Sequence, residues 1–165
     1  MHDRLQAMAR WMWEGRSRRE RHRNLPDDLR PASIAEAYAA QEAYYRLAEP
    51  VYGPVAGAKI ATTTKVMQRL TGINHPCGGA IFSRTIHRSP ATLRAADFVN
   101  LRIESEIALA LGADLPAAGA PWTRETVAPA VAAALPSFEL IEDRNALWPG
   151  SPITSASAAA ISERV

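Results

Sequence analysis

Apolar and polar residues alternate in residues 98–111, and this pattern constrains the fold more than any other part of the chain. A repeat of two residues is typical of a β-strand. Glu104 and Glu106 stand two apart in this segment, so their side chains project from the same face with Cβ atoms roughly 6–7 Å apart. Two like charges at this spacing, when partly buried, destabilise a sheet unless a cation or an arginine compensates them. The strand therefore predicts a place where positive charge is bound.

A third glutamate, Glu139, interrupts an otherwise apolar strand expected over residues 137–141. A carboxylate in such a strand must find a partner, because burying it alone is costly. If it converges with the first two, three carboxylates without histidine or cysteine form a hard oxygen site, which favours Mg²⁺ or Mn²⁺ over Zn²⁺. The alternative is a solvated sheet face on which Arg102 and Arg144 pair with the glutamates. Spacing alone leaves both interpretations open.

Helical and strand patterns elsewhere predict an α+β fold. Ser33 and Glu36 form a capping box that begins a helix, and we expect this helix to end before Pro50. A short strand rich in small residues follows over residues 55–60 and brings Lys59 to its end.

Threonines precede two further helices that we expect. One runs over residues 65–70 and ends at Gly72. The other begins after Thr123 and continues to about Leu135, with Pro129 producing a kink or a new start. A strand follows this second helix.

Arginines crowd the first 23 residues of a chain whose net charge is +2 and whose pI is near 9.0. Such a run is found in nucleic-acid-binding proteins. However, Met8, Trp11 and Trp13 lie among the arginines, and no known nucleic-acid motif follows. An amphipathic helix with a solvated arginine face is the better interpretation, so we expect no nucleic-acid partner.

The chain has 165 residues, enough for one domain with a core, and a single cysteine, Cys77. One cysteine excludes an intramolecular disulfide framework and suits a reducing compartment, so we expect a cytoplasmic protein. No apolar run approaches the roughly 20 residues of a membrane helix, and we expect no membrane association.

Four segments occur in an order and spacing that are typical of one enzyme family. They are IAEAYAAQEA (34–43), VAGAKIATTTKVMQ (55–68), RIESEIALALGADLP (102–116) and LPSFELIEDRN (135–145). Together they resemble the 2-keto-4-pentenoate hydratase / 2-oxohepta-3-ene-1,7-dioate hydratase group of the fumarylacetoacetate hydrolase superfamily. The resemblance implies N-terminal helices followed by part of a rolled, mostly antiparallel β-sheet.

The resemblance also implies a site. Glu104, Glu106 and Glu139 match the family's ligands of Mg²⁺ or Mn²⁺. Lys59, one of only two lysines in the chain, matches a lysine near the substrate carboxylate and enol. Glu139 is the candidate for moving protons, with Glu142 as a weaker one because it faces the other way on an ideal strand.

The activity that the resemblance implies is hydration of 2-hydroxy-2,4-dienoates, of the 2-oxopent-4-enoate type, to 4-hydroxy-2-oxo acids in aromatic catabolism. The small acid substrate would bind a homo-oligomeric, metal-dependent lyase. Two alternatives are a decarboxylase of the 4-oxalocrotonate type from the same family and a non-catalytic remnant that serves as an interaction module.

The resemblance fades after Asn145, and Ala61 stands where the family has glycine. We therefore expect a truncated or frame-disrupted member of the family. Its parts would be an arginine-rich helix and connector (1–32), a hydratase-like α+β domain (33–145) and a divergent Ser/Ala-rich tail (146–165).

Overall fold

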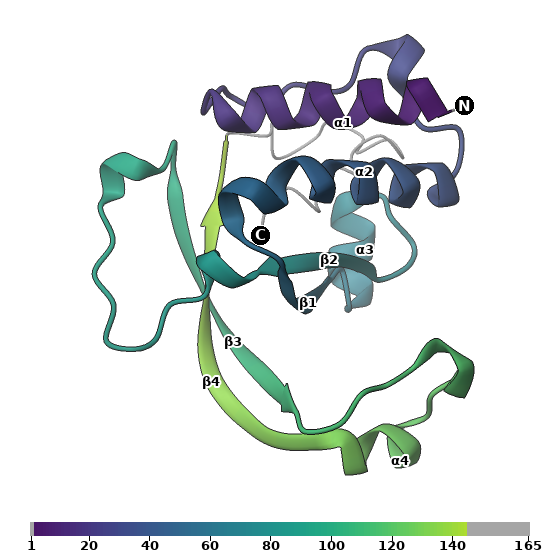
Figure 1. Cartoon of the computed structure of the whole chain (residues 1–165), viewed down its shortest axis with the longest axis vertical. Helices are drawn as coiled ribbons and strands as arrows, with labels where there is room; N and C mark the ends of the chain where they lie inside the picture. Colours follow the sequence, from purple (N-terminus) through teal and green to yellow (C-terminus); the bar gives the residue numbers. More distant parts are fainter. Residues whose placement is uncertain (1, 145–165) are drawn as a thin grey trace. The chain divides into compact units, whose positions relative to one another are not determined.

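A computed structural model describes residues 2–144, and the tail expected over residues 146–165 lies outside the described residues (Figure 1). The chain divides into two compact units, the first within Met1–Leu101 and Glu142–Val165 and the second Arg102–Ile141. Helices and paired strands both occur, so the predicted α+β class is confirmed. Short 3-10 helices join the longer elements and span Asp27–Leu29, Ser83–Thr85, Ala95–Asp97, Ala117–Gly119 and Ala128–Ala130.

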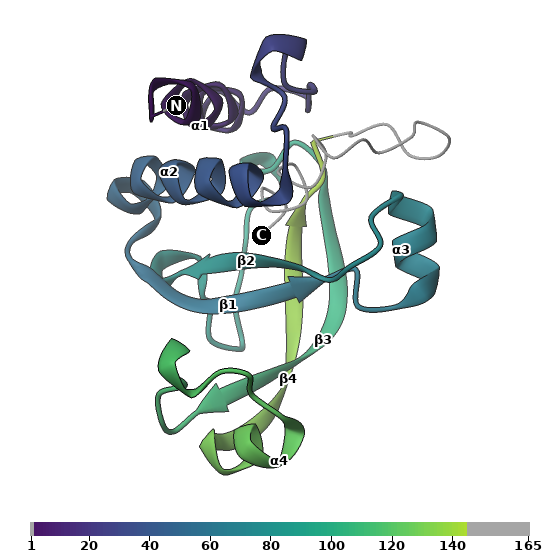
Figure 2. The same cartoon turned by 90° about the vertical axis from the view of Figure 1, so that its right-hand side faces the viewer.

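Two long helices, α1 (His2–Ser17) and α2 (Ile34–Tyr52), lie side by side and form the core of the first unit (Figures 1 and 2). Small and unbranched apolar side chains fill the space between them, which lets the two backbones approach closely. The buried residues of these helices include Met8, Ala9, Met12, Ala40, Ala43, Tyr44 and Ala48. The N-terminal helix predicted from the sequence is therefore confirmed.

The arginines around the end of α1 contact acidic and aromatic side chains. The guanidinium of Arg23 lies 5.5 Å from the ring centre of Trp11. Salt bridges join Arg18 to Glu14 at 3.6 Å, Arg23 to Glu20 at 2.8 Å and Arg19 to Asp97 at 4.0 Å. Helix α1 ends at Ser17, so these three arginines lie in the turn and connector after the helix and not on the helix face that the sequence predicts.

Ser33 caps the first turn of α2 as predicted, but Glu36 binds the amide of Ala32 and not that of Ser33, which a capping box would require. Ser33 Oγ accepts a hydrogen bond from the Glu36 amide at 3.1 Å, and Glu36 Oε2 accepts one from the Ala32 amide at 2.6 Å. The guanidinium of Arg4, on α1, binds the same carboxylate. Glu36 therefore ties the start of α2 to α1 as well as to its own backbone.

The prediction that this helix ends before Pro50 is wrong, because α2 continues to Tyr52. A proline so close to the helix end removes only one hydrogen bond, from the last turn. Gly53 ends the helix instead, with a φ of 82° that favours glycine, and its amide donates to the Glu49 carbonyl at 2.8 Å.

Strands β1 (Val55–Ala61) and β2 (Cys77–Phe82) form an antiparallel pair in the first unit. Lys59 lies opposite Gly79, near the end of β1, as the sequence predicts. Between these strands the chain forms α3 (Lys65–Thr71), which begins at the predicted threonine cap and ends at a left-handed glycine.

The second unit is built on strands β3 (Leu101–Leu111) and β4 (Val131–Glu142), which run in opposite directions in one two-stranded sheet (Figure 1). The amide of Gly112, just after β3, donates a hydrogen bond to the carbonyl of Ala130, just before β4, at 2.8 Å. The predicted period-two strand is thus confirmed.

The helix predicted from Thr123 to about Leu135 is largely wrong. Helix α4 spans only Arg124–Val127, and β4 begins at Val131. The alanines that favour a helix lie after Pro129, which interrupts helical hydrogen bonding, and pairing with β3 outweighs their propensity.

Several large apolar side chains of the second unit are exposed: Ile103, Ile107, Leu109, Leu111 and Phe138. None of the helices formed by residues 2–144 has the length and apolar character needed to cross a bilayer.

We predict that Glu36 makes the stability of the fold decrease as the pH falls into the acid range. The Ala32 amide, followed by the Arg4 side chain, holds the pKa of the Glu36 carboxyl below its ordinary value of 4.5. A lowered folded-state pKa contributes stability that is present above the unfolded value and lost as the pH falls through the folded value. The Tm difference between the wild type and Glu36→Gln should therefore shrink between about pH 6 and about pH 3.

Glu42→Gln is the matched control, because Glu42 lies on the same helix in a more exposed pair with Arg46 at 4.0 Å. Its Tm difference from the wild type should stay small throughout. An equal pH dependence in the two variants would contradict the assignment to Glu36.

Candidate metal centre

Three carboxylates meet on the β3–β4 sheet of the second unit. Glu104 and Glu106 project from one face of β3, as their spacing requires, and Glu139 reaches the same place from β4. One oxygen from each lies within 4.8 Å of the others. Glu104 and Glu106 are exposed, whereas Glu139 is partly buried. The structure therefore brings together the three residues that the sequence singled out.

The donor set fits a hard divalent cation. Ligands of Mg²⁺ or Ca²⁺ lie about 2.0–2.6 Å from the ion, so two oxygens on one ion are at most about 4–5 Å apart. The separation of 4.8 Å or less is compatible with this limit after little or no adjustment. All three donors are carboxylate oxygens, and nitrogen and sulfur ligands are absent from this group, which disfavours Zn²⁺.

Glu142, the weaker candidate for moving protons, has a structural role. Its Oε1 accepts a hydrogen bond from the Val99 amide at 2.6 Å. This bond joins the end of β4 to the segment that precedes β3. A carboxylate held in this way serves the backbone, so Glu139 remains the candidate for proton transfer.

The next two residues are buried in the first unit. The Asp143 amide donates to the Asn100 carbonyl at 3.1 Å, beside a side-chain hydrogen bond from Asn100 to Asp143 at 3.4 Å. Arg144 donates to the Glu20 carbonyl at 3.3 Å and accepts from the His22 amide through its own carbonyl at 2.7 Å. These contacts fix the end of β4 against the connector that follows α1.

Sequence comparison finds relatives of one kind, although no family model matches the chain. A 2-keto-4-pentenoate hydratase of Paraburkholderia phymatum is 28% identical over 146 residues, which are 88% of this chain and 55% of the relative. A 2-hydroxyhexa-2,4-dienoate hydratase of Comamonas testosteroni is 31% identical over 126 residues, 75% of this chain and 47% of the relative. A 2-oxo-hept-4-ene-1,7-dioate hydratase of Escherichia coli is 29% identical over 137 residues, 83% of this chain and 51% of the relative. The relatives are 2-keto-4-pentenoate hydratases and related hydratases, and this chain is similar to them at about 30% identity.

A solved structure shows the same fold. It is the 4-oxalocrotonate decarboxylase of Pseudomonas putida G7 complexed with magnesium and adipate, with a TM-score of 0.81 and 19% identity over 96% of this chain and 59% of that one. The predicted helices and short antiparallel sheets are therefore confirmed, and this chain has the fold of part of that decarboxylase. This chain spans about half the length of the curated relatives it matches.

Lys59, the other residue that the family resemblance selects, lies in the first unit and is partly buried on β1. Its backbone position is fixed by pairing with Gly79 on β2. Its role at the substrate stays a prediction.

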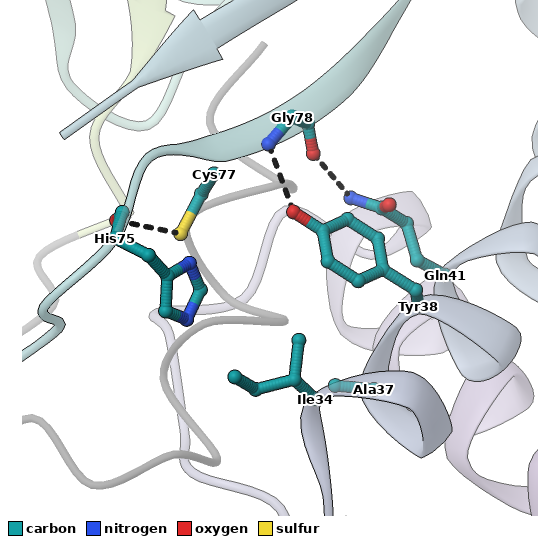
Figure 3. Close-up of a pocket in the computed structure, with 7 residues that line it drawn as sticks. All are labelled: Ile34, Ala37, Tyr38, Gln41, His75, Cys77 and Gly78. Atoms are coloured by element: carbon teal, nitrogen blue, oxygen red, sulfur yellow. Dashed lines mark hydrogen bonds between the residues drawn. The ribbon is translucent and has the colours of Figure 1, made fainter. Parts of the chain in front are cut away.

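Polar groups of α2 that the sequence analysis did not single out bind the backbone of β2. Tyr38 accepts a hydrogen bond from the Gly78 amide, and Gln41 donates one to the Gly78 carbonyl (Figure 3). His75 and Cys77 lie beside them and line a hollow of about 20 Å³, room for a single water. The sequence offered one signal for these contacts, because the Tyr38 hydroxyl and the Gln41 amide are polar groups on an otherwise apolar face of the helix.

We predict that Glu142 contributes to stability and not to cation binding. Glu142→Ala leaves the Val99 amide without its acceptor and should lower the free energy of unfolding by about 1–3 kcal/mol. Chemical denaturation measures this loss. The exposed Asp114→Ala is the control and should change stability little. If Glu142→Ala instead weakened Mg²⁺ binding without destabilising the chain, the structural role would be wrong.

Proposed function

We propose that this chain carries the cation-binding part of a metal-dependent lyase that hydrates 2-hydroxy-2,4-dienoates of the 2-oxopent-4-enoate type to 4-hydroxy-2-oxo acids. The observation that supports it best is the convergence of three carboxylates within 4.8 Å in a chain related to hydratases. Such enzymes would act in aromatic catabolism.

Glu104, Glu106 and Glu139 would hold the cation, Mg²⁺ or Mn²⁺. Such an ion, when bound, supplies positive charge that polarises a 2-oxo acid and stabilises negative charge on its oxygen. Glu104 and Glu106 are exposed and Glu139 is partly buried, so a small acid would reach the centre from the solvent. The magnesium complex of the structurally similar decarboxylase supports Mg²⁺ as the first choice.

Two side chains would take part in the reaction itself. Lys59 would contribute a positive charge at the substrate carboxylate, where its ammonium binds and orients the acid. The carboxylate of Glu139 would move a proton between the attacking water and the carbon chain of the substrate. Water would add at the distal alkene carbon, so that the hydroxyl group of the product stands at C4.

The proposed partner is therefore a small 2-oxo or 2-hydroxydienoate acid. The acidic partners of Arg18, Arg19 and Arg23 argue against nucleic acid as a partner. We also propose a homo-oligomer in the cytoplasm, by resemblance to the family and because the single cysteine, Cys77, is free.

A decarboxylase of the 4-oxalocrotonate type is the second candidate, because the solved structure with a TM-score of 0.81 is such an enzyme. Both reactions place negative charge on the 2-oxygen of an acid. A cation held by the same three carboxylates would stabilise that charge in either reaction. Release of CO₂ from 4-oxalocrotonate, rather than formation of a 4-hydroxy-2-oxo acid, would identify the decarboxylase.

We predict that Mg²⁺ stabilises the chain through the three carboxylates. A free concentration of 100 times the Kd should add about 2.7 kcal/mol to the free energy of unfolding. Titration calorimetry and thermal melting with MgCl₂ measure the binding and the stabilisation. Glu106→Gln keeps the shape but removes one charge, so it should abolish most of the Mg²⁺ effect.

Asp114→Asn is the matched control, because it removes one exposed carboxylate of the same unit outside the centre. It should leave the Mg²⁺ titration unchanged. Equal Mg²⁺ effects in the wild type and Glu106→Gln would show that the three carboxylates do not form the cation site.

We predict that 2-hydroxypenta-2,4-dienoate loses its ultraviolet absorbance when the chain is present with Mg²⁺ or Mn²⁺. The chain without either metal should leave the absorbance unchanged. The two lysines give a matched pair of variants. Lys59→Ala should lower kcat/KM roughly 10²–10⁴-fold, whereas Lys65→Ala should have little effect. Absence of metal-dependent turnover would favour a non-catalytic interaction module, and equal losses in the two variants would contradict the role of Lys59.

A further inference from the structure

One face of α2 hydrogen-bonds the backbone of β2 through three side chains. The Gly78 amide donates to Tyr38 Oη at 3.0 Å, and Gln41 Nε2 donates to the Gly78 carbonyl at 3.2 Å. The Ala80 amide donates to Tyr45 Oη at 2.9 Å. Spacings of three and four residues place these side chains on one side of the helix. Figure 3 shows the first two of these bonds converging on Gly78.

These hydrogen bonds lie on both sides of the residue that pairs with Lys59. In the β1–β2 register, Gly78 is opposite Ile60, Gly79 opposite Lys59 and Ala80 opposite Ala58. The bonds from α2 therefore hold the residues immediately before and after Gly79. The backbone position of Lys59 depends on this stretch of β2.

The sequence of β2 makes these bonds important. Gly78, Gly79 and Ala80 have almost no side chains with which to hold a register by packing. Backbone hydrogen bonds must do this work, from β1 on one edge and from α2 on the other. Gln41 is 5% exposed, and Tyr45 is partly buried, which raises the pKa of its hydroxyl to about 12 and keeps it protonated at neutral pH.

We propose that Tyr38, Gln41 and Tyr45, here called the α2 clamp, are positioning residues for Lys59. The clamp holds Gly78 and Ala80, these fix Gly79, and Gly79 fixes the segment of β1 from which the lysine extends. The importance of this positioning for catalysis rests on the proposed function.

Amine labelling under native conditions tests the proposal without substrate or metal. The chain has only two lysines, so a mass spectrum reports the modification rate of Lys59 against Lys65 on α3 as an internal reference. Loss of one clamp hydroxyl, in Tyr38→Phe or Tyr45→Phe, should raise the Lys59-to-Lys65 rate ratio and the amide exchange of β1 roughly threefold to tenfold. The double variant should raise both further.

Tyr52→Phe is the matched control. It removes a hydroxyl from the same helix, one that accepts from Arg16 Nε at 3.4 Å rather than from β2. It should lower stability without changing the rate ratio. Tyr38→Phe guards against misfolding, because Tyr38 is 38% exposed and loses only its hydroxyl.

The two outcomes separate the clamp from the proposed function. A rate ratio and amide exchange equal to the wild type in both single variants, or an equal rise in Tyr52→Phe, would overturn the clamp. Absence of hydratase turnover in the wild type would overturn the proposed function and leave the labelling result intact. With an active chain, the clamp variants should also lower kcat/KM while Tyr52→Phe does not.

Discussion

Backbone pairing between β3 and β4 holds three carboxylates together against their mutual repulsion. Two unit charges 4.8 Å apart repel by about 1 kcal/mol in water and by about 3–4 kcal/mol at an effective dielectric constant near 20. Because Glu104 and Glu106 are exposed, water screens the repulsion between them toward the lower value. A sheet tolerates this arrangement at a moderate cost, and a divalent cation reverses the sign of the interaction. The pairing is therefore the structural basis of the proposed function.

The two glutamates on β3 could be predicted from the sequence, because a period of two places them on one face whatever the partner strand is. The approach of Glu139 could not. It depends on the register between β3 and β4, and this register depends on where β4 begins. The alanines before Pro136 indicated a helix, whereas pairing with β3 turns them into strand and extends β4 from Val131. Long-range pairing outweighed local propensity, and no sequence pattern reports that balance.

The helices of the first unit followed from local signals more faithfully. Ser33 and Thr64 cap the helices that they were predicted to cap, since a cap needs only a few neighbouring residues. Pro50 was misjudged because the effect of proline depends on how many turns follow it. The polar contacts of Tyr38 and Gln41 with β2 could not be predicted for another reason. They join residues far apart in the chain, and the residue pattern of a helix does not show which strand will lie against it.

The two units support their proposed functional groups in different ways, and this difference bears on what the proposed cation would do. Lys59 stands on a strand pair that is backed by α2 and a buried core. The carboxylates stand on a two-stranded sheet whose large apolar side chains, among them Ile107 and Phe138, are exposed. A two-stranded sheet is only marginally stable without further burial. Glu104 and Glu106 lie on β3 and Glu139 lies on β4, so the proposed cation would be held by residues of both strands. Binding of the cation would then also stabilise a sheet to which the exposed side chains contribute little.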